Sequence, residues 1–120
     1  MRICTNIILD SIVYLSIIIV WQQHQREKIK SKLDKILKSL DVWYFNPQSG
    51  IFGKSGVPDK ILCVNGHFIG VECKADRSKK PTALQLKCMK DIELHGGKCF
   101  VACDDKSINE VKLYIESVKW

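Results

Sequence analysis

The sequence predicts an α/β or α+β protein in which a sheet is covered by helices. Three observations predict this fold class: an amphipathic helical stretch, two strand-like runs joined by Asn65-Gly66, and an alternation of helix, strand and helix after them. The length of 120 residues suits one domain with a modest core. The sequence shows no internal repeat and no low-complexity segment.

The first residues differ in composition from the rest of the chain. Residues 3–21 are nearly uncharged and end in the apolar run Ile12 to Trp21, but Asp10 and several polar residues interrupt them. A membrane-spanning helix needs about 20 predominantly apolar residues, and a charge near its centre costs about 2.5 to 3.5 kcal/mol. Three interpretations stay open: a membrane or interface anchor, an extra packing helix, and an extension from a start placed too far upstream. We therefore divide the chain into an apolar leader, residues 1–21, and a domain, residues 22–120.

A basic amphipathic helix is expected over residues 22–40. Lysines surround apolar side chains that recur at helical spacing: Ile29, Leu33, Ile36, Leu37 and Leu40. These lysines favour a solvated face, and contact with phosphate is the alternative for any one of them. Residues 42–45 are an expected short strand, and a glycine-containing loop, residues 46–57, follows it.

Residues 60–64 and 67–74 are predicted to form the two strands of a hairpin. The Asn65-Gly66 pair between them is a strong hairpin signal, because both central positions of a type I′ turn need positive φ. A two-residue turn makes Val64 face His67. That pairing sets the register of the whole hairpin.

This register places the carboxylates of Asp59 and Glu72 directly opposite each other. Because side chains alternate along a strand, Lys74 shares their face and Cys73 points away. Like charges at facing positions destabilise a sheet, and a divalent cation held by both carboxylates offsets that repulsion. Two acids and a lysine beside a metal ion suit phosphodiester cleavage. Spacing alone leaves the alternative of a surface ion pair between Lys74 and Glu72.

The second half of the chain is predicted to alternate helix, strand and helix. Pro81-Thr82 is a typical helix start, and the helix is expected to end near His95. The remaining expected features, in chain order, are a Gly96-Gly97 stop, a strand over residues 98–103, a turn over residues 104–106, and a last helix with Ser107 and Glu110 as its capping box.

Charge and cysteine content narrow the class of protein. Nineteen Lys and Arg against thirteen Asp and Glu give a net charge of +6, which favours a polyanionic partner such as nucleic acid. The six cysteines do not form the two closely spaced pairs of a zinc knuckle, and several occupy apolar positions of expected strands or helices. We expect reduced thiols in a cytosolic protein.

Around these residues the sequence resembles the PD-(D/E)XK nuclease superfamily. Pro58-Asp59 matches its first acid, and Glu72-Cys73-Lys74 matches its Glu-X-Lys motif. The stretches GKSGVPD, PTALQ and HGGKCFVA are similar, in order and spacing, to the virus-type replication-repair nuclease (VRR-NUC) domain. The resemblance covers roughly residues 25–118 and rests on several features that agree. It implies a restriction-endonuclease-like PD-(D/E)XK core, which is an α/β fold with a small mixed sheet flanked by helices.

The resemblance also implies a role for each matching residue. Asp59, Glu72 and the backbone carbonyl of Cys73 would bind Mg²⁺ or Mn²⁺. Lys74 would be the catalytic lysine. Gln85 corresponds to a glutamine that the family places near the site, and its alternative is an ordinary polar residue in the first turn of a helix.

Further candidates surround this set. Glu27 matches a glutamate that the family often carries near the start of its first helix and is a candidate third acid, although it lies away from the apolar stripe. Glycines within residues 50–56 would let backbone approach a phosphate closely, and a flexible linker explains the same residues. The candidate DNA contacts are Lys54, Ser55, Arg77, Lys79 and Lys80.

Together these features favour a Mg²⁺- or Mn²⁺-dependent DNA endonuclease. The resemblance points to branched, flapped or four-way junction DNA in replication, repair or recombination, as for Holliday junction resolvases, in a viral or phage setting. Cutting a four-way junction takes two symmetric copies, so a homodimer is expected. The alternatives are a catalytically silent DNA-binding or assembly module and a partner protein tethered to a membrane by its leader. The expected location is the cytoplasm, or the host cytoplasm for a viral protein.

Overall fold

The computed structural model describes residues 2–48 and 53–120, with residues 2–8 described by their backbone alone. Three helices and four strands form within these ranges. In chain order they are α1 (Arg2–Ser39), β1 (Trp43–Phe45), β2 (Lys60–Val64), β3 (His67–Cys73), α2 (Ala83–Leu94), β4 (Lys98–Ala102) and α3 (Asp105–Val118). The sheet has the order β1-β2-β3-β4. It is mixed, because β3 pairs antiparallel with β2 and parallel with β4, which confirms the predicted fold class.

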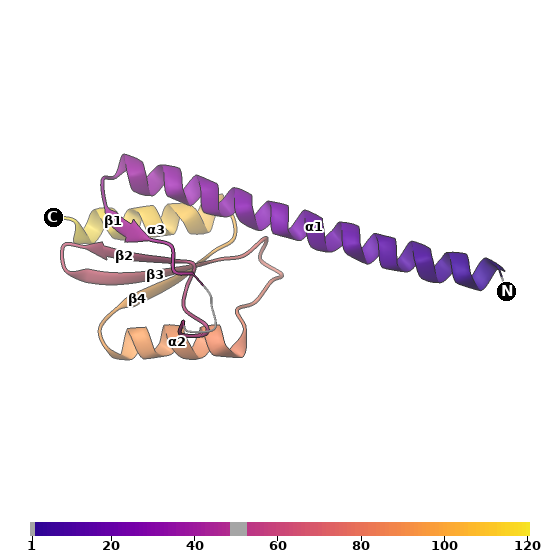
Figure 1. Ribbon diagram of the computed structural model, residues 1–120. Coiled ribbons are helices and arrows are strands. Elements are labelled where there is room, and N and C mark those ends of the chain that lie inside the picture. Colours follow the sequence, from indigo (N-terminus) through magenta and orange to yellow (C-terminus); the bar gives the residue numbers. More distant parts are fainter. Residues whose placement is uncertain (1, 49–52) are drawn as a thin grey trace.

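The helices cover the two faces of the sheet unequally. Figure 1 shows α1 and α3 on one face and α2 on the other. The main core lies beneath α1 and α3. Its buried apolar side chains are Ile29, Leu33, Leu37, Leu62, Val64, Ile69, Val71, Cys73, Ala102, Ile108, Val111 and Ile115. Each such side chain contributes about 1.5 to 3 kcal/mol through burial of apolar surface, so this face supplies most of the hydrophobic stabilisation.

The hairpin has the register that its turn predicts. Asn65 and Gly66 have φ values of 49° and 81°, as a type I′ turn requires. Val64 pairs with His67, and the pairing continues to the far end of β2. The parallel partner β4 extends the sheet past Cys73, where the Lys74 amide donates to the Ala102 carbonyl at 2.9 Å.

The helix α3 begins earlier than predicted. Asp104, not Ser107, is the N-cap: its carboxylate accepts from the Ser107 amide at 2.8 Å, and the Ser107 side chain bonds back to the Asp104 backbone. The expected capping box of Ser107 and Glu110 is therefore wrong. Aspartate and serine are comparable caps, and the extended backbone of Asp104 places the start of the helix there.

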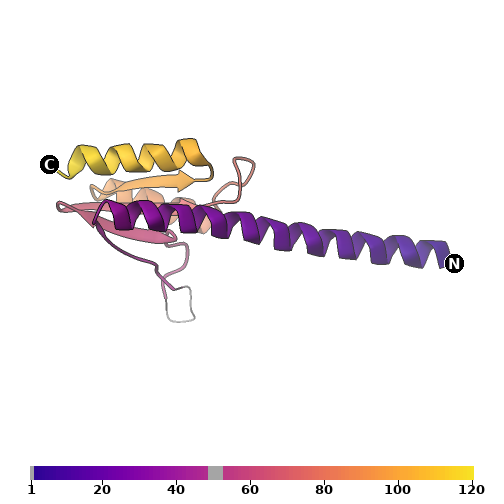
Figure 2. The same ribbon diagram turned by 90° about the horizontal axis from the view of Figure 1, so that it is seen from above.

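The helix α1 is one continuous helix that includes both the apolar leader and the basic segment. Its second half packs on the sheet, whereas its first half extends far beyond it (Figures 1 and 2). The division at residue 22 is therefore no break in the backbone. Apolar side chains are exposed along the extension: Leu9, Ile12, Val13, Tyr14, Leu15, Ile17, Ile19, Val20 and Trp21. Within the part of the chain that could be assessed, no helix has the length and apolar character needed to cross a membrane.

The described cysteines are free thiols, as the sequence predicts: Cys63, Cys73, Cys88, Cys99 and Cys103. Burial raises the pKa of Cys73 to about 12 and that of Cys99 to about 11. Both thiols therefore stay protonated at neutral pH and act as small apolar side chains.

Candidate active site

The structure brings four of the predicted site residues together in one group, called the acid–lysine cluster below. Asp59 directly precedes β2, Glu72 lies on β3, Lys74 follows that strand and Gln85 lies in the first turn of α2. Parallel pairing with β4 continues through Lys74, which holds the end of β3 in place. The cluster thus combines the start of one strand, the end of its neighbour and the start of a helix.

Gln85 connects the lysine to the buried acid. The Lys74 ammonium donates to Gln85 Oε1 at 2.9 Å, and the Gln85 amide nitrogen donates to Glu72 Oε1 at 3.2 Å. Gln85 also forms a capping box with Thr82, whose amide donates to the same Gln85 oxygen at 2.9 Å. The helix cap therefore orients the side chain that holds Lys74. The distance from Lys74 Nζ to Glu72 Oε1 is 3.7 Å.

The two carboxyl groups lie on the same side of the sheet, as the hairpin register predicts. Asp59 Oδ2 accepts a hydrogen bond from the Cys73 amide at 2.9 Å, which fixes the Asp59 side chain against the end of β3. Glu72 is only 1% exposed. Among the described residues no donor reaches Glu72 Oε2, which is buried. An orphaned carboxylate oxygen of this kind needs a proton or a cation.

The local environment moves the pKa values of these two acids in opposite directions. Burial, then the hydrogen bond to Asp59 and the Asp59 charge, raise the pKa of Glu72 to about 7, although Lys74 and Arg26 act against the rise. Burial also acts to raise the pKa of Asp59. The Cys73 amide, the hydrogen bond with Glu72 and the charges of Arg26 and Lys30 outweigh it, so the pKa of Asp59 falls below its ordinary value. At neutral pH the cluster therefore holds an ionised Asp59 beside a Glu72 carboxyl group that is partly protonated.

The cluster offers hard oxygen ligands for a divalent cation. Asp59 and Glu72 supply carboxylate oxygens, and the Cys73 carbonyl oxygen accepts from the same guanidinium as Asp59, so these two oxygens converge on one point. Mg²⁺ is commonly held by one or two carboxylates and completes its shell with water and substrate. The orphaned Glu72 oxygen fits such a cation. In the described part of the chain there is no group of three or more His, Cys, Asp or Glu side chains suited to a metal.

Sequence reasoning missed two cations that α1 contributes to the cluster. The Arg26 guanidinium donates to Asp59 Oδ1 at 2.6 Å and to the Cys73 carbonyl at 3.1 Å. Lys30 Nζ lies 3.7 Å from the same Asp59 oxygen. Their spacing of four residues places them on one side of a helix, which was the available signal. Without the packing direction of α1, that signal does not distinguish them from the other basic residues.

Glu27 lies outside the acid–lysine cluster. Its side chain is exposed, and its carboxylate lies 3.4 Å from Lys30 Nζ. Lys30 therefore stands between Glu27 and Asp59. The geometry brings no third carboxylate to the two acids within the described residues.

A hollow of about 280 Å³ opens beside the cluster. Its lining includes Arg26, Asp59 and Gln85 from the cluster region and the predicted DNA contacts Lys54 and Ser55. The loop is held there by Gly56, where an added Cβ would lie 2.4 Å from the Leu84 carbonyl oxygen of α2. The glycine thus serves close packing of the loop on the helix. Gly50 lies outside the described residues.

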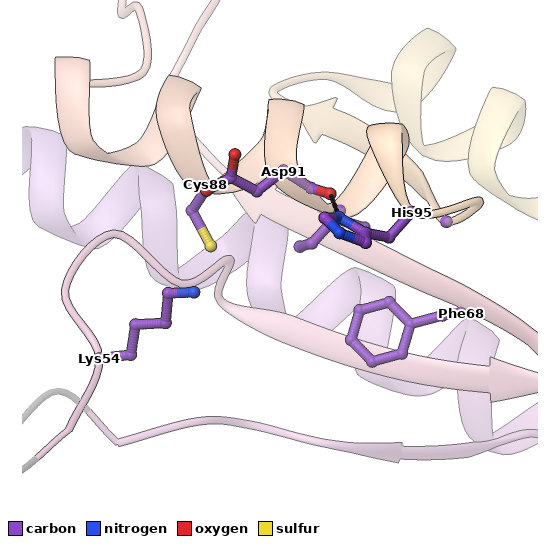
Figure 3. Close-up of a pocket in the computed structure, with 7 residues that line it drawn as sticks. Lys54, Phe68, Cys88, Asp91 and His95 are labelled. Atoms are coloured by element: carbon purple, nitrogen blue, oxygen red, sulfur yellow. Dashed lines mark hydrogen bonds between the residues drawn. The ribbon is translucent and has the colours of Figure 1, made fainter.

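A second hollow of about 640 Å³ lies between β3 and α2, and Figure 3 shows the residues that line it. Lys54 lines both hollows, so they adjoin. Figure 3 shows the exposed ring of Phe68, which comes from β3, and the His95 imidazole, which comes from the end of α2, among the side chains that line this hollow. The ring nitrogen Nδ1 of His95 is bonded to the Asp91 carbonyl oxygen at 2.7 Å. Lys54 thus places a cationic side chain on the wall of both hollows.

The other predicted DNA contacts lie at a third hollow. Arg77, Lys79 and Lys80 line it together with residues of β4 and α3. The Arg77 guanidinium pairs with Asp104 at 2.5 Å, so its charge is already balanced. Lys79 and Lys80 are exposed.

Comparison with protein-family models and with curated proteins identifies no relative. No protein-family model matches the chain. No curated protein matches it either. Functional inference therefore depends on the arrangement of the acid–lysine cluster.

Proposed function

We propose that this protein is a divalent-metal-dependent DNA endonuclease that hydrolyses phosphodiester bonds. The observation that supports this most is the meeting of Asp59, Glu72 and Lys74, with a buried carboxylate oxygen that has no donor among the described residues. A hairpin that brings the acids and the lysine together is also what a PD-(D/E)XK core, and the VRR-NUC domain that the sequence resembles, would require. Mg²⁺ or Mn²⁺, when bound, would polarise a phosphate oxygen and lower the pKa of a coordinated water.

In this proposal Asp59, Glu72 and the Cys73 carbonyl hold the cation. The Cys73 amide fixes Asp59 through Oδ2, which leaves Oδ1 as its ligand oxygen. Gln85 holds Glu72 through Oε1, which leaves the orphaned Oε2 as the other. In each acid one oxygen is thus held by a neighbouring amide, and the other oxygen is the one that we assign to the cation.

Lys74 is the group suited to act on the substrate. Its ammonium is half-buried and is fixed by Gln85 at 2.9 Å, so little reorganisation is needed to orient a water or to stabilise charge on a phosphodiester. Gln85 acts through Lys74 as a positioning residue. Fixed donors aimed at developing charge typically contribute about 100- to 1,000-fold in rate.

The surface around the cluster suits a DNA backbone. Lys54 and Ser55 line the hollow that contains Asp59, and the net charge of +6 attracts polyanions. The second hollow continues from Lys54 towards Phe68, whose ring could stack with an unpaired base. We propose a preference for branched, flapped or four-way junction DNA, cut by a homodimer.

The test is cleavage of flapped, four-way and linear DNA by the purified protein with Mg²⁺ or Mn²⁺. Lys74→Ala and Asp59→Ala are each expected to lower the cleavage rate by about 100-fold or more. Lys112→Ala on α3 removes a lysine remote from the cluster and is the control. Equal cleavage by Lys74→Ala and by the parent would show that the site is assigned wrongly.

The same assay distinguishes the nuclease from the alternative function, a catalytically silent module. A catalytically silent DNA-binding or assembly module would bind these DNAs in a gel-shift assay and leave them uncut with either metal. The presence of both acids and the lysine favours the enzyme over this module, because Lys74 lies 3.7 Å from Glu72 and Asp59 is fixed to the same strand end by the Cys73 amide.

A further inference from the structure

Arg26 lies where a cation held by the two acids would have to lie. Its Nη2 donates to Asp59 Oδ1 at 2.6 Å, and its Nε donates to the Cys73 carbonyl at 3.1 Å. The same Nη2 lies 3.9 Å from Glu72 Oε1. One guanidinium thus bonds Asp59 Oδ1 and the Cys73 carbonyl, which are two of the three oxygens that the proposed function assigns to the metal, and it lies close to the third ligand residue, Glu72.

The contacts of Arg26 are with the oxygens that a metal ion would need. Asp59 Oδ2 is already used by the Cys73 amide, so Oδ1 is the oxygen left for a ligand. Arg26 occupies that oxygen. A guanidinium has donors only and keeps its charge at any ordinary pH, so it and a divalent cation repel each other at this spot.

The side chain of Arg26 has room to leave. It is 37% exposed and forms part of the wall of the hollow lined by Lys54 and Ser55. The helix that carries it is fixed by Ile29 and Leu33, which are buried in the core. Rotation of one side chain into the hollow would therefore free the oxygens without moving the backbone.

We propose that Arg26 is a resident counter-cation of the acid pair, and that a divalent metal binds only when its guanidinium withdraws from Asp59 and Cys73. The inference rests on the proposed function, because it concerns the same ligand oxygens. Without metal, Arg26 offsets the repulsion between the two acids and keeps them in place. With metal, it becomes a competitor, so metal affinity is lower than the ligand set alone would give.

Lys30 provides the matched control. It is a second cation of α1 and its Nζ lies 3.7 Å from the same Asp59 oxygen. Its described contacts are with Asp59 and Glu27, not with the Cys73 carbonyl. Arg26→Met and Lys30→Met each remove one positive charge near Asp59. Only Arg26→Met also frees the two ligand oxygens, Asp59 Oδ1 and the Cys73 carbonyl.

The experiment measures Mn²⁺ binding to the full chain without DNA. Protein freed of metal with EDTA and dialysed is titrated with Mn²⁺, and free Mn²⁺ is followed by its electron paramagnetic resonance signal. Removal of a unit charge at contact distance from a divalent ion changes affinity by roughly 30-fold even at the dielectric constant of water, so both variants should bind more tightly than the parent. Arg26→Met is expected to exceed Lys30→Met by about tenfold, a difference of about 1.4 kcal/mol.

The outcomes separate this inference from the proposed function. Equal tightening by the two variants, or none by Arg26→Met, would overturn the role of Arg26 and leave the metal site intact. No Mn²⁺ binding by any of the proteins would refute the metal-dependent function and this inference with it. If Arg26→Met does not fold in EDTA by circular dichroism, Arg26→Lys replaces it. That variant keeps the charge but cannot span both oxygens, so tighter binding than the parent supports the inference and unchanged binding overturns it.

Discussion

The two faces of β3 differ although their residues alternate along one strand. Ile69, Val71 and Cys73 point under α1 and α3 and are fully buried among apolar side chains. Phe68 and Glu72 belong to the face beneath α2, where the ring is exposed and the carboxylate joins a network of charged groups. One seven-residue strand thus supplies both the core and the candidate site.

The difference shows how a small domain can place charges without losing its core. The face beneath α1 and α3 carries the hydrophobic stabilisation, so the face beneath α2 can hold buried polar groups that cost stability. Lys60 is an exception, because it is a charged residue buried on the face beneath α1 and α3. It is only 1% exposed, and its ammonium pairs with Asp34 of α1 at 2.5 Å and bonds Asn46 at 3.0 Å.

The largest expected effect comes from placing the same charge on each face of β3. Val71→Asp buries an isolated carboxylate in the core, at a cost of several kcal/mol that is comparable with the total stability of a small domain. We expect no folded protein. Phe68→Asp, at a position 46% exposed, should fold with a melting temperature near that of the parent. Circular dichroism melts of both variants test this, and a similar loss in both would remove the distinction between the faces.

A smaller loss of stability is expected when the buried Lys60 loses its partner Asp34. Asp34→Ala leaves the buried Lys60 ammonium with Asn46 as its remaining bonded partner among the described residues. Removing one partner of a buried pair typically costs about 3 to 5 kcal/mol. Urea unfolding measures the loss, and Asp10→Ala, which changes an exposed aspartate on the same helix, is the control. A loss no larger than that of the control would mean that Lys60 finds water or another acceptor.

The smallest effect concerns the start of α3, on the edge of the apolar face. Hydrogen bonds from the Ser107 backbone and hydroxyl, with the Arg77 contact, lower the pKa of Asp104 to about 2. A lowered carboxyl pKa gives stability that is present above the ordinary value of 3.8 and is lost as the pH falls towards 2. Asp104→Ala should therefore be less stable than the parent at pH 7, and the difference in unfolding free energy between the two proteins should become smaller below pH 4.

Urea unfolding from pH 7 to the lowest pH at which both proteins fold measures this gap. Asp104→Asn keeps a capping oxygen without the titration, so its difference from the parent should vary less with pH. If the difference in unfolding free energy between Asp104→Ala and the parent stays the same down to the lowest pH, the charge of Asp104 is not its source.

Local chemistry made the hairpin predictable, and with it half of the candidate site. Asn65-Gly66 dictates the turn, the turn dictates the register, and the register puts Asp59 beside Glu72. The strand order could not be predicted in this way, because the alternation of helices and strands indicates a sheet covered by helices but not which strands pair. The boundary of α3 was missed because Asp104 and Ser107 are both good caps, and sequence does not show which backbone is extended.

The contribution of α1 could not be predicted, because it depends on how a long helix crosses the sheet. Periodicity identifies the buried stripe of α1 but not which flank approaches the end of β3. Arg26 and Lys30 approach it, whereas Glu27, between them in sequence, is exposed. Likewise, nothing local to Lys60 predicts that Asp34 covers it.

The uninterrupted course of α1 affects the electric field at the acids. A helix carries about half a positive charge at its amino end, and α1 begins about 36 Å of helix before Arg26. Removal of residues 1–21 would move that positive end, with its unpaired amide groups, to about 6 Å from Arg26. In a chain shortened in this way, the more positive field at the two acids would therefore weaken the binding of a divalent ion, whatever other role the leader has.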